Sequence, residues 1–198
     1  MPHVSPRRAL LKLICCALPL LAAAPAHAAT ACSYPNATPV FRPWLDTALY
    51  TPFPGSTFEQ GAAGWSWGGK ANIVGGDSNL FLAPGSHAVE IPGGGTAKSP
   101  WVCVNATTPS MRFFVRRVSG SGLMHVQGVL SGPTGKLSSI IMPVSAAAGW
   151  QPSPVVLFPP AFMTVLSTAG YQAQFLFVAD AGTTFRIDDV ELDPFKGH

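Results

Sequence analysis

Short apolar segments separated by glycine and proline set the narrowest limits on how this chain can fold. Its 20 glycines and 20 prolines fall largely between segments rich in β-branched and aromatic residues, which is typical of short strands joined by turns. No window carries a capped helix of useful length. We therefore predict an all-β sandwich or barrel, with ten strands at Trp65–Trp67, Ala71–Val74, His87–Ile91, Ser110–Val118, Leu123–Leu130, Lys136–Met142, Pro154–Phe158, Phe162–Leu166, Tyr171–Ala179 and Phe185–Leu192.

Residues 1–28 have the features of an export signal. Arg7, Arg8 and Lys12 precede an apolar run, and Ala26-His27-Ala28 matches a small-residue cleavage site. The run is too short to span a membrane stably, so we expect a secreted mature protein without membrane insertion. Arg7-Arg8 also resembles the twin-arginine pattern, and the choice between the two export routes stays open.

The mature chain divides into an arm and a body. Residues 29–57 hold prolines that break helices and central strands, together with aromatic residues at irregular spacing, so we predict an extended arm that packs on the body. Residues 58–198 contain the predicted strands and form one sandwich domain. About 170 residues after the signal suffice for a single core.

Two cysteines remain once the signal is removed. Cys15 and Cys16 lie within it, which leaves Cys32 and Cys103 as an even pair in an oxidising compartment. We predict a disulfide between them that ties the arm to the body. Alternatively, Ala29-Thr30-Ala31-Cys32 is a lipoprotein cleavage box, which would anchor the protein through a lipid on Cys32 and leave Cys103 unpaired.

The formal net charge of +3 belongs to the signal. Removing Arg7, Arg8 and Lys12 from the 12 cationic residues leaves nine, against nine acidic residues. A formally neutral chain has no long-range attraction for phosphate backbones or anionic lipid. We therefore expect neither nucleic acid nor a membrane surface as partner, and a neutral polar ligand such as a sugar fits better.

The last predicted strand must change register. Phe185 and Ile187 alternate as core residues, whereas Val190 and Leu192 continue on the other parity, so a β-bulge is required at Asp188-Asp189. Two adjacent carboxylates at a bulge, in a chain this poor in charge, either reach water or meet a cation.

Two motifs carry a family resemblance. The stretch Phe58-Glu59-Gln60-Gly61, followed by Gly64-Trp65, and the stretch Phe185-Arg186-Ile187-Asp188-Asp189-Val190 resemble the opening and closing strands of bacterial carbohydrate-binding modules with the galactose-binding-like jelly roll. The resemblance implies a single jelly-roll β-sandwich. The same framework also serves proteins that bind no sugar.

The resemblance also implies a structural calcium ion. Glu59 and Asp188 would supply its side-chain ligands, and backbone carbonyls would complete the six to eight oxygens that Ca²⁺ prefers. Asp189 would then point to solvent across the bulge. Alternatively, Glu59 is solvated and Asp188-Asp189 pair with Arg186 or Arg112.

Sugar recognition needs a flat apolar contact and nearby groups that hydrogen-bond hydroxyls. We single out Trp67, Trp150, His125 and Gln127 as ligand-binding candidates. Trp65, by the family pattern, is a core residue. Trp101, two residues before Cys103, either contacts ligand or only packs on the disulfide.

We therefore predict a secreted, non-catalytic protein that binds carbohydrate or cell-wall glycan. The alternative is a structural or interaction protein of the cell envelope that has the framework but no sugar site. A secreted hydrolase is the third hypothesis, since Gly76-Asp77-Ser78 resembles an esterase nucleophile block and Glu90 with Asp188 or Glu191 could form an acid pair. The sequence leaves the glycan and the oligomeric state open.

Overall fold

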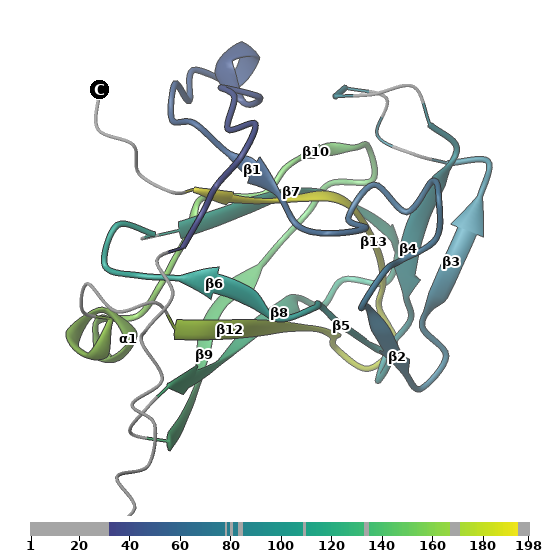
Figure 1. Cartoon of the computed structure of the whole chain (residues 1–198). Helices are drawn as coiled ribbons and strands as arrows, with labels where there is room; N and C mark the ends of the chain where they lie inside the picture. Colours follow the sequence, from purple (N-terminus) through teal and green to yellow (C-terminus); the bar gives the residue numbers. More distant parts are fainter. Residues whose placement is uncertain are drawn as a thin grey trace, which may run out of the picture.

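Two antiparallel sheets form the protein (Figure 1). The computed structural model describes residues 32–77, 79, 81–82, 85–108, 110–132, 135–166 and 171–193; the predicted export signal, residues 1–28, lies outside them. The seven-stranded sheet has the order β10-β7-β13-β4-β3, with β1 on β13 and β11 on β7. Its strands are β1 (Thr51–Pro52), β3 (Asn72–Gly75), β4 (His87–Ile91), β7 (Ser110–Ser119), β10 (Gln151–Pro152), β11 (Val156–Leu157) and β13 (Thr184–Asp193).

The six-stranded sheet has the order β2-β5-β12-β8-β9, with β6 on β12. Its strands are β2 (Ser66–Gly68), β5 (Thr96–Lys98), β6 (Val102–Val104), β8 (Met124–Gly132), β9 (Gly135–Val144) and β12 (Tyr171–Ala179). The predicted all-β sandwich is confirmed.

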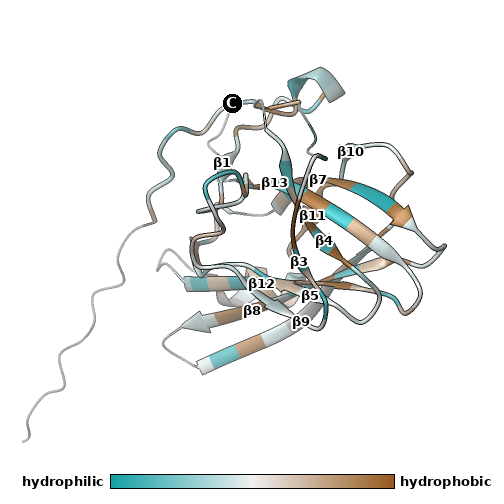
Figure 2. Ribbon diagram, turned by 90° about the vertical axis from the view of Figure 1, so that its right-hand side faces the viewer, coloured by the Kyte–Doolittle hydropathy of each residue, from teal (hydrophilic) through white to brown (hydrophobic). Residues whose placement is uncertain are grey.

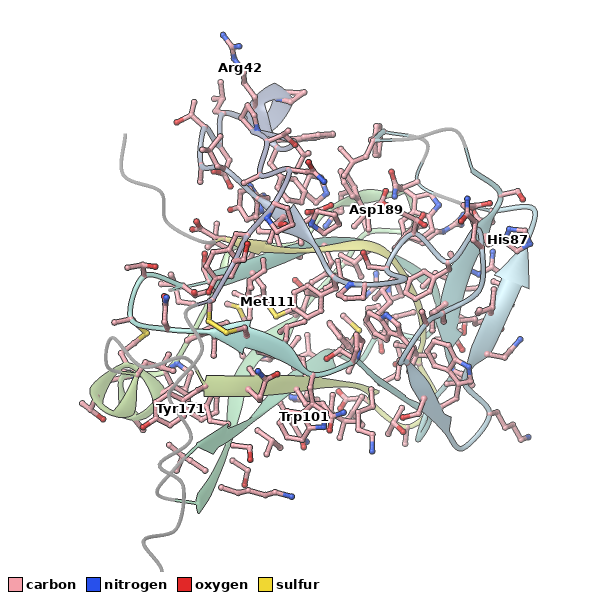
Figure 3. All side chains as sticks on the ribbon, in the orientation of Figure 1. Arg42, His87, Trp101, Met111, Tyr171 and Asp189 are labelled. Atoms are coloured by element: carbon pink, nitrogen blue, oxygen red, sulfur yellow. A yellow bond between two sulfur atoms is a disulfide. The ribbon has the colours of Figure 1, made fainter. Side chains whose placement is uncertain are left out.

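Alternating residues place the core between the sheets. In β12 every second residue from Tyr171 to Ala179 is buried, and β8 buries Met124, Val126, Gly128 and Leu130. Hydrophilic and hydrophobic residues accordingly alternate along the strands in Figure 2. Met111 of β7, which is fully buried, lies between the two layers (Figure 3).

The predicted bulge in the last strand is present. The pairing of β13 with β7 shifts between Asp188 and Glu191, and Asp189 has a φ of 43°. Because of this shift, Ile187 and Val190 both belong to the core cluster, as the register argument required. β13 lies between β7 and β4, so the bulge is at the centre of the seven-stranded sheet.

The arm covers the outer face of the seven-stranded sheet, at the upper left of Figure 1. Phe41 and Tyr50 from the arm enclose Phe114 of β7 in a second apolar cluster, and all three side chains are buried. Arg112 of β7 donates to Asp46 of the arm at 2.5 Å. Cys32 and Cys103 form the predicted disulfide. The arm is therefore fixed to the body by a covalent bond, a buried ion pair and an aromatic cluster.

Several elements differ from the prediction. Phe162–Leu166 is not a strand: a short helix, α1 (Pro160–Val165), occupies it. Its start at Pro160 suits a first helical turn, and buried Phe162 and Leu166 are four residues apart, so they share one helix face. The three-residue strands β5 and β6, the arm strand β1 and a turn of 3-10 helix at Arg42–Trp44 were not predicted. Within the described residues, every helix is too short or too polar to cross a membrane.

Candidate functional site

The six-stranded sheet presents an uncovered outer face. Antiparallel partners point their side chains to the same side, so Lys98 of β5, Leu176 of β12 and Gln127 of β8 form one row across it. Thr96 and His125 belong to the next row. None of these side chains is buried. On the seven-stranded sheet the arm covers the outer face around Phe114. Beside it, Arg116, Arg186 and Glu90 keep partly exposed side chains that are engaged in ion pairs.

A hollow of about 270 Å³ opens at the β2 end of this face. Ser66, Thr96 and Lys98 contribute hydroxyl and ammonium groups to its lining, and Leu176 adds an apolar surface. Trp67 also lines the hollow. Trp67 is paired with Ala97, which is fully buried, so its ring lies on the core side of β2. It stacks on Trp65 at a centroid distance of 6.1 Å and does not form the predicted platform on the open face.

Two predicted candidates, His125 and Gln127 of β8, do lie on the open face. His125 Nε2 lies 2.9 Å from Asp180 Oδ1, which orients the ring and leaves Nδ1 for another partner. The Gln127 amide makes no hydrogen bond to the described residues. The structure therefore brings Trp67, His125 and Gln127 to one sheet, with Gln127 two strands from Lys98.

Trp150 lies elsewhere, and the structure does not join it to these three residues. Its ring is half-buried against the arm cluster, and its Nε1 donates to Asp77 Oδ1 at 2.8 Å. Asp77 also accepts hydrogen bonds from Arg116 and Arg186, and Arg186 pairs with Glu90 at 2.7 Å. Asp77 and Glu90, the acids named for a hydrolase, are thus bound to arginines, and Trp150 serves as a hydrogen-bonded cover over that network.

An acidic cluster surrounds the bulge. Asp188 and Asp189 are 3% and 5% exposed, on the side of β13 that faces away from the six-stranded sheet (Figure 3). Asn79 donates through Nδ2 to Asp188 Oδ2 at 3.0 Å and to Asp189 Oδ2 at 2.6 Å. The expectation that Asp189 points to solvent is therefore wrong, because the loop carrying Asn79 closes over it.

The carboxylates raise one another's pKa. Burial, followed by the charge of Asp189, raises the pKa of Asp188 to about 8. Burial and the charge of Glu59 raise the pKa of Asp189 as well. Glu191 Oε2 is buried and has no hydrogen-bond partner among the described residues. Burial, followed by the charge of Asp189, raises the pKa of Glu191. The proposed pairing of Asp188-Asp189 with Arg186 or Arg112 is also wrong, since both arginines bind other acids.

Glu59 is held apart from the aspartates by its own partners. Its Oε1 accepts from the backbone N–H groups of Ser86 and His87, and its Oε2 lies 2.9 Å from His87 Nδ1. Burial opposes ionisation here, but these hydrogen bonds outweigh it and lower the pKa of Glu59. Gly85 permits this approach, because a Cβ there would lie 2.5 Å from Glu59 Oε1.

A calcium ion is compatible with the chemistry of this cluster but not with every predicted donor. Buried carboxylates without a cationic neighbour are the hard oxygens that Ca²⁺ prefers, and Asp188 with Asp189 meets that description. Glu59, with both oxygens engaged, does not. No group of three or more His, Cys, Asp or Glu side chains is arranged to hold a metal in the described part of the chain.

Some residues of the site escaped the sequence reasoning. Thr96 and Lys98 lie in a strand of three residues, too short for a periodicity signal. Asn79 lies in the loop after β3, and its contacts with β13 span 109 and 110 residues of chain. A contact between residues this far apart in the chain leaves no pattern in the local sequence from which it could be predicted.

Comparisons with known proteins point to the fold. No family model and no curated protein match the chain. Among solved structures, it is similar to a family 61 carbohydrate-binding module in complex with β-1,4-galactotriose (16% identity, TM-score 0.42, 70% of this chain and 94% of that chain). It is also similar to the CBM22-1 xylan-binding domain from Paenibacillus barcinonensis Xyn10C (12%, 0.48, 72% and 94%).

A third similar structure is the family 11 carbohydrate-binding module of a cellulosomal Clostridium thermocellum cellulase (11%, 0.39, 72% and 93%). At these identities and TM-scores the similarity concerns the fold alone. The β-sandwich assignment rests on the two sheets described above.

Proposed function

We propose that this protein is a secreted, non-catalytic glycan-binding protein that binds along the outer face of the six-stranded sheet. The observation that carries the proposal is the open face of this sheet, with its row of polar side chains beside a hollow. From β2 to β8 that row crosses three strand spacings, or about 14 Å. This width suits a ligand larger than one sugar ring.

The chemistry of the row suits a neutral sugar chain. Lys98 donates hydrogen bonds, and the Gln127 amide both donates and accepts, as hydroxyl groups require. Leu176 lies between them in the same row and offers an apolar floor for a sugar ring. The side chains of Lys98 and Gln127 make no hydrogen bond or ion pair to the other described residues, so a ligand need not break an internal contact.

A structural or interaction protein of the cell envelope is the second candidate. It is favoured by the partial burial of Trp67, which leaves no described aromatic ring lying flat on the open face. Export itself rests on residues 1–28. The lipid-anchored alternative would need the Cys32 sulfur that the disulfide occupies.

Binding to insoluble polysaccharides and to a glycan array tests the proposal. Gln127→Ala and Lys98→Ala should each weaken binding about tenfold, the cost of roughly one hydrogen bond to an ionic or amide group. Gln172→Ala is the matched control, because Gln172 lies on the same face of β12 but four residues from Leu176. Failure of the wild-type protein to bind any glycan would favour the second candidate.

We also propose that the bulge holds a calcium ion, with Asp188 and Asp189 as its carboxylate ligands. The support is their burial without a cationic neighbour. Calcium bound to the folded state alone would stabilise it by about 2.7 kcal/mol at a hundredfold excess over Kd. Identical melting curves in millimolar calcium and in EDTA would remove the ion.

A further inference from the structure

A second cavity of about 270 Å³ lies between the arm and the body, separate from the open sheet face. One wall comes from the arm, with Tyr34, Pro35, Pro52 and Pro54. The facing wall includes Trp101, on the segment between β5 and β6 (labelled in Figure 3). Trp101 is 40% exposed, the most exposed tryptophan among the large apolar side chains of the described chain.

The walls of this arm cavity are fixed in place. The Tyr34 hydroxyl lies 2.6 Å from Thr108 Oγ1, so its ring is anchored beside the Cys32–Cys103 disulfide. Thr51 Oγ1 donates to the carbonyl of Pro35 at 2.9 Å. The arm strand that carries Thr51 pairs with β13. A cavity held in this way binds without an ordering cost, which favours affinity.

The lining selects against charge. No charged side chain occurs among the described residues that line the cavity. The prolines have no N–H. The carbonyls of Pro35 and Pro54 already accept from Thr51 Oγ1 and Trp65 Nε1, so each offers its second lone pair to a ligand. The Trp101 indole N–H makes no hydrogen bond to the described residues and can donate to a ligand.

We propose that the arm cavity binds a neutral sugar residue, with the Trp101 ring as its apolar contact. Hydroxyl groups donate to the proline carbonyls, and one accepts from the Trp101 indole. An extended proline-rich peptide also binds aromatic grooves, but it needs a groove several residues long, whereas this cavity is smaller than an ordinary small-molecule pocket. The site goes beyond the sheet-face function and does not depend on it.

Fluorine NMR of the secreted protein labelled with 5-fluorotryptophan tests both sites at once. The chain has five tryptophans, and Trp101→Phe assigns the resonance of interest by its loss. The probes are galactose, glucose, mannose, xylose and N-acetylglucosamine, together with β-1,4-galactotriose, xylohexaose and a nonaproline peptide. Trp44, half-buried in the arm contact and outside the cavity lining, provides the reference resonance.

We expect a saturable shift of the Trp101 resonance with at least one sugar probe. Trp101→Ala should weaken that sugar about tenfold, while Gln127→Ala leaves its affinity at this site unchanged. If only the Trp67 resonance shifts, the cavity site is overturned and the sugar binds at the sheet-face hollow. If only the Trp101 resonance shifts, the sugar binds in the arm cavity. The sugar assignment is overturned if no sugar moves Trp101, or if nonaproline alone does.

Discussion

The pH dependence of stability follows from the buried carboxylates at the bulge. Asp188 has a pKa of about 8 in the folded protein, against 3.8 when unperturbed. Its ionisation therefore costs more in the folded state than in the unfolded state. The free energy of unfolding should fall as pH rises above about 4 and should level off above about 8.

The magnitude follows from the shift. At 1.36 kcal/mol per pKa unit, a shift of about four units corresponds to about 6 kcal/mol, of which about 4 kcal/mol falls between pH 5 and pH 8. This is an upper limit, because Asp188 and Asp189 titrate as a pair and Asn79 supplies hydrogen bonds to both. Calcium should oppose the loss, since it favours the ionised carboxylates.

Urea unfolding in EDTA at pH 5, 6, 7 and 8 measures this slope. Asp189→Asn should flatten it and raise the stability at pH 8, because the substitution removes the charge next to Asp188 while its carbonyl still accepts from Asn79. The same substitution should reduce the effect of added calcium.

Asp180→Asn is the matched control. Asp180 is outside the cluster, and a backbone hydrogen bond from Leu123 lowers its pKa, with His125 adding to the effect. It therefore titrates below the tested window and should leave the slope above pH 5 unchanged. A wild-type stability in EDTA that stays constant or rises from pH 5 to pH 8 would refute the reasoning.

Three further changes probe the arm and its neighbours. Replacing Cys32 and Cys103 by serine should cost about 4 kcal/mol for the loss of a loop closed over 71 residues, measured by urea unfolding. Arg112→Ala leaves Asp46 unpaired against the aromatic cluster and should cost about 3 kcal/mol, with faster proteolysis of the arm as the local readout. Trp150→Phe keeps an aromatic ring but loses the N–H that donates to Asp77, so the free energy of unfolding should fall by about 1 kcal/mol. If the same substitution also lowered the affinity for a glycan, Trp150 would belong to the ligand site after all.

The features that the sequence predicted well have local causes. The bulge in β13 follows from the spacing of Ile187 and Val190. They are three residues apart, so a regular strand would place them on opposite faces, and only a bulge lets both reach the core. The disulfide follows from having two cysteines left after the export signal. Strand β12 was predicted with its observed bounds, because its first residues alternate and the later ones are apolar on both faces, as in a central strand.

The features that were missed depend on distant contacts or on competing local rules. The segment Phe162–Leu166 has apolar residues that suit a strand, yet Pro160 and the four-residue spacing favour the helix observed. Asp189 was expected in water because the sequence of β13 contains no signal for its contact with Asn79, which lies 110 residues earlier in the chain. Trp67 was chosen for the glycines that follow it, whereas stacking on Trp65 decides how much of its ring is exposed.

The arm packs on the outer face of one sheet and leaves the outer face of the other sheet uncovered. By packing Phe41 and Tyr50 on Phe114, it buries part of the outer face of the seven-stranded sheet, and it supplies Asp46 to the ion pair with Arg112. The six-stranded sheet has no such cover, so its polar row remains accessible. The same arm, anchored at Cys32, creates the cavity opposite Trp101. The arm therefore determines both which sheet face a ligand can reach and where a second ligand could bind.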